Sequence, residues 1–175
     1  NFLTKIGTEQ DESSVIVDTT IPKINELTNF IRGGQLVVIA ADTGIGKSTF
    51  AMQIATNHLL NGSGNVLFMS FEMKVQEMIC RIMAYASGVN YNDLYCNLNG
   101  LKDDDWRRIV EAYEKLQEKV CGLNTVYNAE LDKIQFEVNK YIKQHGAPEL
   151  IVVDYISLIK ADQKLSKVQQ VTMIT

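Results

Sequence analysis

The sequence has little of what marks secreted, membrane-spanning or metal-binding proteins. Its three cysteines, Cys80, Cys96 and Cys121, lie far apart without a C-x-x-C pair, which argues for reduced thiols in a cytosolic setting and against a disulfide framework or a zinc site. No apolar run approaches the length of a membrane span, and the first residues do not resemble a signal peptide. A net charge of −4 argues against a general affinity for nucleic acid. This net charge does not exclude a small basic patch on the surface.

Length and composition predict one globular domain. A chain of 175 residues is long enough for a substantial core, and 46% hydrophobic with 22% charged residues is ordinary for a soluble protein. Residues 1–20 are polar, which indicates a linker or N-terminal arm, and residues 21–175 are expected to form the domain. The chain does not begin with Met, and the apolar pattern of Val168, Val171 and Ile174 is not followed by a capping signal. We therefore expect a part of a longer polypeptide.

Apolar runs and amphipathic stretches alternate along the chain. The runs typical of buried strands are residues 35–40, 65–70, 123–128 and 149–159. The helical spacing of apolar residues predicts helices over residues 47–61, 75–88, 103–120 and 131–145, with Asp103, Asp104 and Asp105 in the first turn of the third. Strands that alternate with helices predict an α/β fold, with a mostly parallel sheet flanked by helices.

The stretch AADTGIGKSTF, residues 40–50, matches a phosphate-binding loop with one departure. In the pattern G-x-x-x-x-G-K-[ST] the first position is glycine, whereas Ala41 stands there in this sequence. A strand before the loop and a helix after it are the context that such a loop requires. Backbone N–H groups of residues 42–48 and the helix N-terminus would then surround the phosphates of a nucleotide. The alternative is a glycine turn before an ordinary helix, with Lys47 merely solvated.

Every residue of this loop is a candidate nucleotide contact. Lys47 is expected to contact the β- and γ-phosphates, and Ser48 to coordinate Mg²⁺. Gly44 and Gly46 let the backbone approach the phosphates closely, and Ala41 is acceptable if its backbone keeps a negative φ. The predicted nucleotide-binding residues are Ala41, Asp42, Thr43, Gly44, Ile45, Gly46, Lys47, Ser48 and Thr49.

Two acidic residues follow other predicted strands. Asp154 ends LIVVD and is expected to face Ser48 and hold Mg²⁺ through water, because the carboxyl ends of parallel strands converge; the alternative is an aspartate that simply ends a strand. Glu72 follows VLFMSF and is a candidate base for an attacking water. From spacing alone, a helix-start glutamate favoured by the helix dipole is an equal alternative for Glu72. His58 and His145 have no evident partner and are not proposed as catalytic.

Three segments resemble the RecA-like motor domain of DnaB-family replicative helicases. In chain order they are AADTGIGKSTFAMQIA, VLFMSFEM and LIVVDYISLI. That family commonly has alanine where Ala41 stands, and SFEM is the most specific element. With IPKINELTNFIRGGQLVVIA, the resemblance covers residues 21 to about 170. It implies a RecA-like P-loop NTPase with Lys47 and Glu72 as catalytic residues, and with Ser48 and Asp154 as the residues associated with Mg²⁺. Arg81 falls on an arginine often seen in the helix after the glutamate, and no role is assigned to it.

The resemblance implies an ATP-dependent DNA helicase motor that translocates on single-stranded DNA and unwinds duplex DNA during replication. It implies ATP and Mg²⁺ as cofactors, and single-stranded or forked DNA, primase and a helicase loader as partners. It also implies a homo-oligomeric ring, expected to be a hexamer, in the cytoplasm of a bacterial or phage-infected cell.

The family's sensor glutamine, arginine finger and most DNA-binding loops are expected after about residue 175. The chain alone should therefore bind ATP better than it hydrolyses it, because an arginine finger supplies several orders of magnitude in rate. The alternatives are a RecA- or KaiC-like ATPase of recombination or signalling, and a nucleotide-binding regulator or loader.

Overall fold

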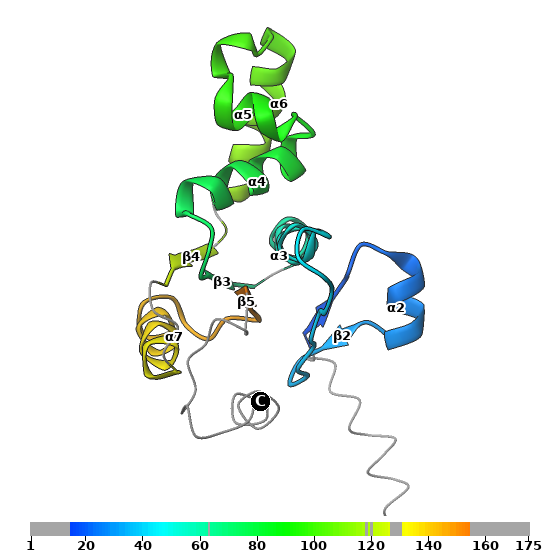
Figure 1. Ribbon diagram of the computed structural model, residues 1–175, viewed down its shortest axis with the longest axis vertical. Coiled ribbons are helices and arrows are strands. Elements are labelled where there is room, and N and C mark those ends of the chain that lie inside the picture. Colours follow the sequence, from blue (N-terminus) through cyan, green and yellow to red (C-terminus); the bar gives the residue numbers. More distant parts are fainter. Residues whose placement is uncertain (1–14, 63, 118, 120, 127–130, 155–175) are drawn as a thin grey trace, which may run out of the picture.

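The computed structural model describes residues 15–62, 64–117, 119, 121–126 and 131–154, and these contain a three-stranded parallel sheet between helices (Figure 1). The sheet has the order β4 (Cys121–Thr125), β3 (Val66–Ser70), β5 (Leu150–Asp154). A separate antiparallel ribbon pairs β1 (Ile16–Val17) with β2 (Ile31–Arg32). The helices are α2 (Pro22–Thr28), α3 (Lys47–Asn61), α4 (Val75–Ser87), α5 (Tyr91–Cys96), the 3-10 turn η1 (Leu98–Gly100), α6 (Asp103–Leu116) and α7 (Leu131–His145). The predicted α/β fold with a parallel sheet is confirmed.

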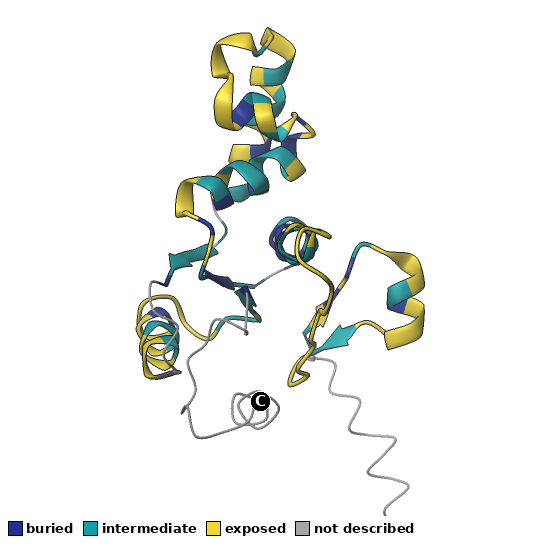
Figure 2. Cartoon of the chain, in the orientation of Figure 1, coloured by how far each residue is buried: buried dark blue, intermediate teal, exposed yellow. Residues whose placement is uncertain are grey.

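The central strand β3 is buried along its whole length (Figure 2). Val66 and Phe68 belong to a core cluster with apolar side chains of α3 and α4. Leu67 and Met69 face the other way and pack with Tyr141 of α7. Helices on both faces explain why the sequence of this strand is continuously apolar rather than alternating, because both sets of side chains lie in a core.

Phe68→Ala is expected to lower the free energy of unfolding by about 3–5 kcal/mol, because it leaves a cavity at the centre of the sheet. Phe68 is 0% exposed and packs against both α3 and α4. Denaturant unfolding followed by circular dichroism measures the change. Phe136→Ala on α7 is the control, because Phe136 is 65% exposed, and a similar loss in both variants would contradict the assigned core.

Most predicted elements are present, with shifted ends. The helices α3, α4 and α7 lie where the apolar spacing predicted them, whereas α6 ends at Leu116 instead of near residue 120. Strand β4 begins two residues before the predicted run 123–128. Residues 127–128 and 155–159 of the predicted strands lie outside the described residues. The short helix α5 was not predicted, since its six residues carry no helical repeat.

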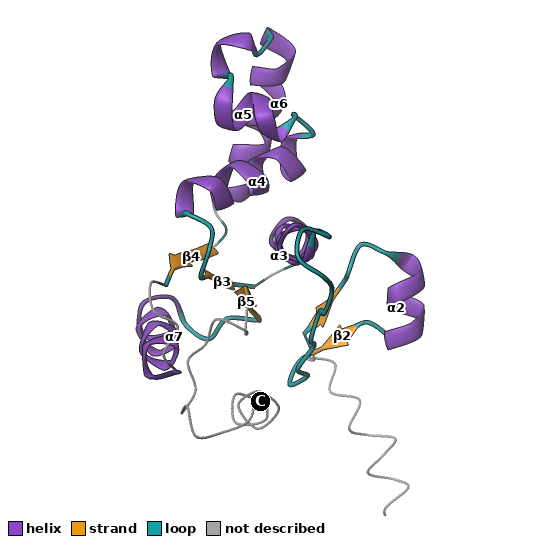
Figure 3. Cartoon of the chain, in the orientation of Figure 1, coloured by secondary structure: helices purple, strands orange, loops and turns teal. Residues whose placement is uncertain are grey.

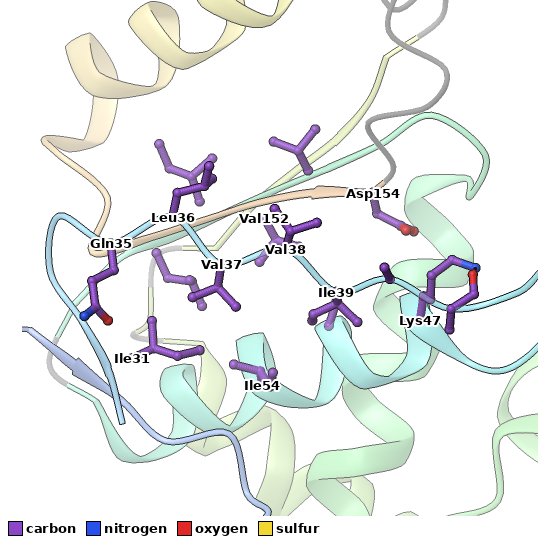
Figure 4. A pocket seen from close by; sticks show the side chains of 16 residues that line it. Ile31, Gln35, Leu36, Val37, Val38, Ile39, Lys47, Ile54, Val152 and Asp154 are labelled. Atoms are coloured by element: carbon purple, nitrogen blue, oxygen red, sulfur yellow. Dashed lines mark hydrogen bonds between the residues drawn. The ribbon is translucent and has the colours of Figure 1, made fainter. Parts of the chain in front are cut away.

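The apolar run 35–40 was predicted as a strand, and this prediction is wrong for the described residues. Residues 36–40 make no backbone hydrogen bond to any described residue, and the segment is an extended connection between β2 and α3 (Figure 3). It runs beside β5, and a cavity of about 400 Å³ separates the two (Figure 4). A strand requires a hydrogen-bonded neighbouring strand as well as an apolar sequence. Among the described residues, no strand lies close enough to residues 36–40 to form these hydrogen bonds.

Part of the polar N-terminal segment is structured. Ile16 and Val17 pair with β2, and Thr19 is buried. The Thr19 hydroxyl and backbone N–H both donate to the Asn25 side-chain oxygen, at 2.7 and 3.0 Å, which ties this segment to α2. The division of the chain at residue 20 stays a prediction. No helix in the described ranges is long and apolar enough to cross a membrane.

Candidate nucleotide-binding site

The loop of residues 41–46 leads directly into the N-terminus of α3. Gly44 and Gly46 have φ of +82° and +103°, which residues with a side chain rarely adopt. No described heavy atom lies within 4 Å of the place where a Cβ on either glycine would be, so the loop surface is open. Ala41 keeps a negative φ, as its side chain requires. The other predicted contacts in this loop, Asp42, Thr43 and Ile45, are exposed.

The side chain of Lys47 folds back over the loop. Its ammonium Nζ donates to the backbone oxygens of Ala41 and Asp42, at 2.7 and 2.8 Å. The positive charge therefore lies at the N-terminus of α3, where the helix dipole already favours an anion. The arrangement provides a cationic, open surface of the kind that binds phosphate groups.

Ser48 and Asp154 meet although they are 106 positions apart in the sequence. The Ser48 hydroxyl donates to Asp154 Oδ1 at 2.9 Å. The other carboxylate oxygen, Oδ2, is buried and has no hydrogen-bond partner among the described residues. A hydroxyl beside a carboxylate with a free oxygen fits Mg²⁺, which binds through one or two carboxylates together with water and nucleotide phosphates. No cluster of three or more acidic, His or Cys side chains suited to a metal ion occurs in the described part of the chain.

Burial raises the pKa of Asp154 above its usual value. The hydrogen bond from Ser48 acts in the opposite direction, as do the charges of Lys47 and Arg81, while the charge of Glu72 raises the pKa further. The folded protein thus holds the proton of Asp154 more tightly than the unfolded chain does. The free energy of unfolding must therefore fall as the pH rises from the ordinary carboxyl pKa through the raised one.

Asp154→Asn is expected to stabilise the nucleotide-free protein at pH 7, because it removes a buried negative charge with an unpaired oxygen. A gain of about 1 kcal/mol corresponds to a thermal midpoint about 2–4 °C higher. The difference should disappear at a pH below the carboxyl pKa, where Asp154 is neutral. Calorimetry at both pH values measures this, with the exposed Glu114→Gln as control. A lower midpoint for Asp154→Asn at pH 7 would contradict the destabilising role of the charge.

Glu72 lies at the same edge of the sheet as Asp154. Ser70 is in register with Asp154, and Glu72 follows two residues later. The Ser70 hydroxyl accepts from the backbone N–H groups of Glu72 and Met73, at 3.3 and 2.9 Å, which fixes the turn after β3. The Glu72 side chain is exposed, and its charge acts on Asp154. The structure thus brings Lys47, Ser48, Glu72 and Asp154 to one end of the sheet.

Two residues have partners that the sequence did not indicate. Arg81, which had no assigned role, donates from Nη1 to the hydroxyl of Thr49 at 3.2 Å. His58, expected to have no partner, is buried and lies 2.9 Å from Glu149 Oε2. Glu149 precedes β5, whereas Asp154 ends it, so the His58 pair lies at the opposite end of the strand from the loop. Neither pair has a local sequence signal, because the partners are 32 and 91 positions apart.

Comparisons with known proteins show the family to which the chain is similar. Residues 17–175 match the family model described as the DnaB-like helicase C terminal domain. The replicative DNA helicase DnaB of Buchnera aphidicola subsp. Baizongia pistaciae (strain Bp) is 29% identical over 145 residues, which are 82% of this chain and 31% of that protein. DnaB of Geobacillus stearothermophilus is 24% identical over 161 residues, 91% of this chain and 35% of that protein. The chain thus spans about a third of the length of these curated relatives.

Two solved structures share the fold. A DnaB-like replicative helicase, solved together with its interactions with primase, gives a TM-score of 0.80 at 19% identity, covering 99% of this chain and 42% of that chain. A second structure, described as an ATPase domain, gives a TM-score of 0.79 at 19% identity, covering 99% of this chain and 61% of that chain. At this identity the likeness bears on the fold alone, and it confirms the RecA-like class that the sequence motifs implied.

Proposed function

Because the chain belongs to the family of DnaB-like helicase C-terminal domains, we propose that it is the ATPase motor of a replicative DNA helicase. The observation that carries the proposal is the hydrogen bond between Ser48 and Asp154, which joins the phosphate-binding loop to the end of β5. With Lys47 over the loop and Glu72 at the neighbouring strand end, the site has a group for each requirement of ATP hydrolysis: phosphate binding, metal binding and activation of water.

Each of these residues has one task in the proposal. Lys47 and the backbone N–H groups of the loop bind the phosphates of ATP. Ser48 and Asp154 hold Mg²⁺, which neutralises phosphate charge when bound. Glu72 accepts a proton from the attacking water, since its side chain is exposed at the edge where the γ-phosphate would lie. Thr49 and the exposed loop residues, Asp42, Thr43 and Ile45, surround the nucleotide.

The partners follow from the motor function. We propose that the protein acts on single-stranded and forked DNA as a homo-oligomeric ring, with six subunits, in the cytoplasm. The DnaB-like helicase among the solved structures interacts with primase, and we extend this partner, together with a helicase loader, to the present chain. The net charge of −4 indicates that DNA contacts must come from a local basic surface and not from the overall charge.

A combined ATPase and unwinding experiment tests the function. Full-length protein is assayed for ATP hydrolysis with and without single-stranded DNA, and for strand displacement on a forked duplex with ATP or a non-hydrolysable analogue. A helicase motor should show stimulated hydrolysis and ATP-dependent displacement. Stimulation without displacement would favour a recombination ATPase. Hydrolysis that DNA does not change would favour a signalling ATPase, regulator or loader.

A further inference from the structure

Helix α3 and strand β5 are joined by polar contacts at both ends. At the phosphate-binding end, the Ser48 hydroxyl donates to Asp154 Oδ1 at 2.9 Å. At the far end, Nε2 of His58 lies 2.9 Å from Oε2 of Glu149, the residue directly before β5. The start of α3 thus meets the end of β5, and the later part of α3 meets the start of β5. Two polar contacts therefore bracket the region in which the helix packs along the strand.

The segments between the two contacts have nearly equal lengths. Ser48 and His58 are ten positions apart on α3, which is about 15 Å at the rise of an α-helix. Glu149 and Asp154 are five positions apart, which is about 16–17 Å at the rise of a parallel strand. Because the two lengths match, both contacts form with α3 at a single position along β5.

The packing between the two contacts is apolar. Ala55 and Leu59 of α3 belong to the same core cluster as Leu150 and Val152 of β5. Apolar burial is non-directional, so it stabilises the helix against the strand without strictly fixing its position along the strand. Hydrogen bonds depend on distance and angle. The polar contacts at the two ends therefore set how far α3 lies along β5.

The far contact is enclosed by the protein. The His58 side chain is 4% exposed, and the Glu149 side chain is 26% exposed. The backbone N–H of Glu149 donates to the Asn65 carbonyl oxygen at 2.8 Å, which holds the start of β5 beside the start of β3. A Cβ on Gly64 would overlap the Glu149 carboxyl group, so the turn before β3 closes over the pair. Breaking a buried hydrogen bond of this kind costs free energy, because its partners are left without water.

We propose that His58 and Glu149 are positioning residues that hold Ser48 and Asp154 at the separation that Mg²⁺ requires; this proposal rests on the proposed function. Mg²⁺ needs near-ideal octahedral geometry, with ligand distances of about 2.0–2.1 Å. A small shift of α3 along β5 therefore weakens the metal site. The proposed phosphate contacts of Lys47 and the loop move together with α3, so the shift leaves them intact. The pair thus acts on the part of nucleotide binding that depends on Mg²⁺.

Titration calorimetry of the full-length protein with ATP, in Mg²⁺ and in EDTA, tests the pair. His58→Leu removes the donor and keeps a buried side chain of similar size. Gly64→Ala displaces the Glu149 carboxyl group without changing α3. Each should reduce the gain in ATP affinity that Mg²⁺ provides by about three- to tenfold, the size typical of residues that couple through packed elements. The ATP affinity in EDTA should stay unchanged.

Two control variants separate the hydrogen bond from other effects. His58→Gln should keep the full Mg²⁺ effect, because the glutamine amide can donate to Glu149 from about the place of Nε2. His145→Leu removes a histidine from the same end of the sheet and should also change nothing, since His145 is exposed on α7 and only its backbone oxygen bonds to Asn65. Electron paramagnetic resonance of Mn²⁺ bound with ATP is a second readout. Mn²⁺ should dissociate more readily from His58→Leu by the same factor.

The outcomes separate this proposal from the function on which it rests. If Mg²⁺ does not raise the ATP affinity of the unaltered protein, the proposed metal site fails and the positioning role fails with it. If Mg²⁺ raises the affinity equally in all variants, only the positioning role is wrong. Equal losses in Mg²⁺ and in EDTA would also overturn it, because the changes would then act on the loop or on folding. A loss in His58→Gln as large as that in His58→Leu would show that the hydrogen bond is not the cause.

Discussion

Glu72→Gln is expected to lower kcat for ATP hydrolysis by about 10²–10⁴-fold and to leave the affinity for ATP nearly unchanged. Glutamine keeps the shape of the side chain and loses its basicity, and positioned general bases contribute rate factors of this size. The local fold should survive, because the Glu72 side chain is exposed and the turn is held by backbone donation to the Ser70 hydroxyl. Steady-state hydrolysis in the full-length protein, with DNA present, gives kcat, and equilibrium titration gives the affinity.

The control for this change is Glu26→Gln, an exposed glutamate on α2 that pairs only with nearby Lys23 in the described contacts. It should leave both quantities unchanged. Hydrolysis by Glu72→Gln at the rate of the unaltered protein would show that Glu72 is not the base. A loss of affinity as large as the loss of kcat would indicate that Glu72 acts on nucleotide binding instead of on water.

Lys47→Ala is expected to weaken ATP binding by about thirtyfold or more and to abolish measurable hydrolysis at ordinary ATP concentrations. The ammonium is the positive charge held over the loop by the carbonyls of Ala41 and Asp42. Removing one member of a charge pair in a binding site commonly costs about 2–5 kcal/mol, which is at least a thirtyfold change in affinity. Titration with ATP and with tripolyphosphate should show the same loss, because the proposed contact of Lys47 is with the phosphates and not with the base.

Lys23→Ala provides the comparison for charge alone, because Lys23 is 76% exposed and lies on α2. It removes the same charge from the protein and should leave ATP affinity unchanged. The thermal midpoint of nucleotide-free Lys47→Ala should also match that of the unaltered protein, since Lys47 is not in the core. Unchanged ATP binding in Lys47→Ala would refute the phosphate-binding role of the loop.

The parts of the fold that depend on local sequence were predictable. Helices α3, α4 and α7 have clear apolar repeats, and Gly88 ends α4 in the left-handed conformation that glycine favours. Strand β3 was also predictable from its local sequence, because a strand that is buried on both faces is continuously apolar. Motifs whose context is a helix start and a strand end also predicted that Lys47, Ser48 and Asp154 lie close together, whereas the roles of these residues stay predictions.

The parts that depend on pairing across the chain were not predictable. The run 35–40 is about as apolar as β3. An apolar sequence indicates that a segment tends to be buried, but it does not indicate whether a neighbouring strand is present to form backbone hydrogen bonds. The partners of His58 and Arg81 come from other elements, so no periodicity points to them. The helix α5 has a different origin, since Asn90 caps it by accepting from the Asn92 N–H at 2.8 Å. A helix of six residues is too short for an apolar repeat to show.

The exposed segment beside β5 has a consequence for how the chain behaves at high concentration. Leu36, Val37, Val38 and Ile39 are between 38 and 60% exposed, and β5 is an edge strand of the described sheet. An open strand edge next to uncovered β-branched side chains is a template for pairing with another polypeptide. The 175-residue chain should therefore self-associate through residues 36–39 and β5, and polar substitutions at Val37 and Val38 should reduce its aggregation.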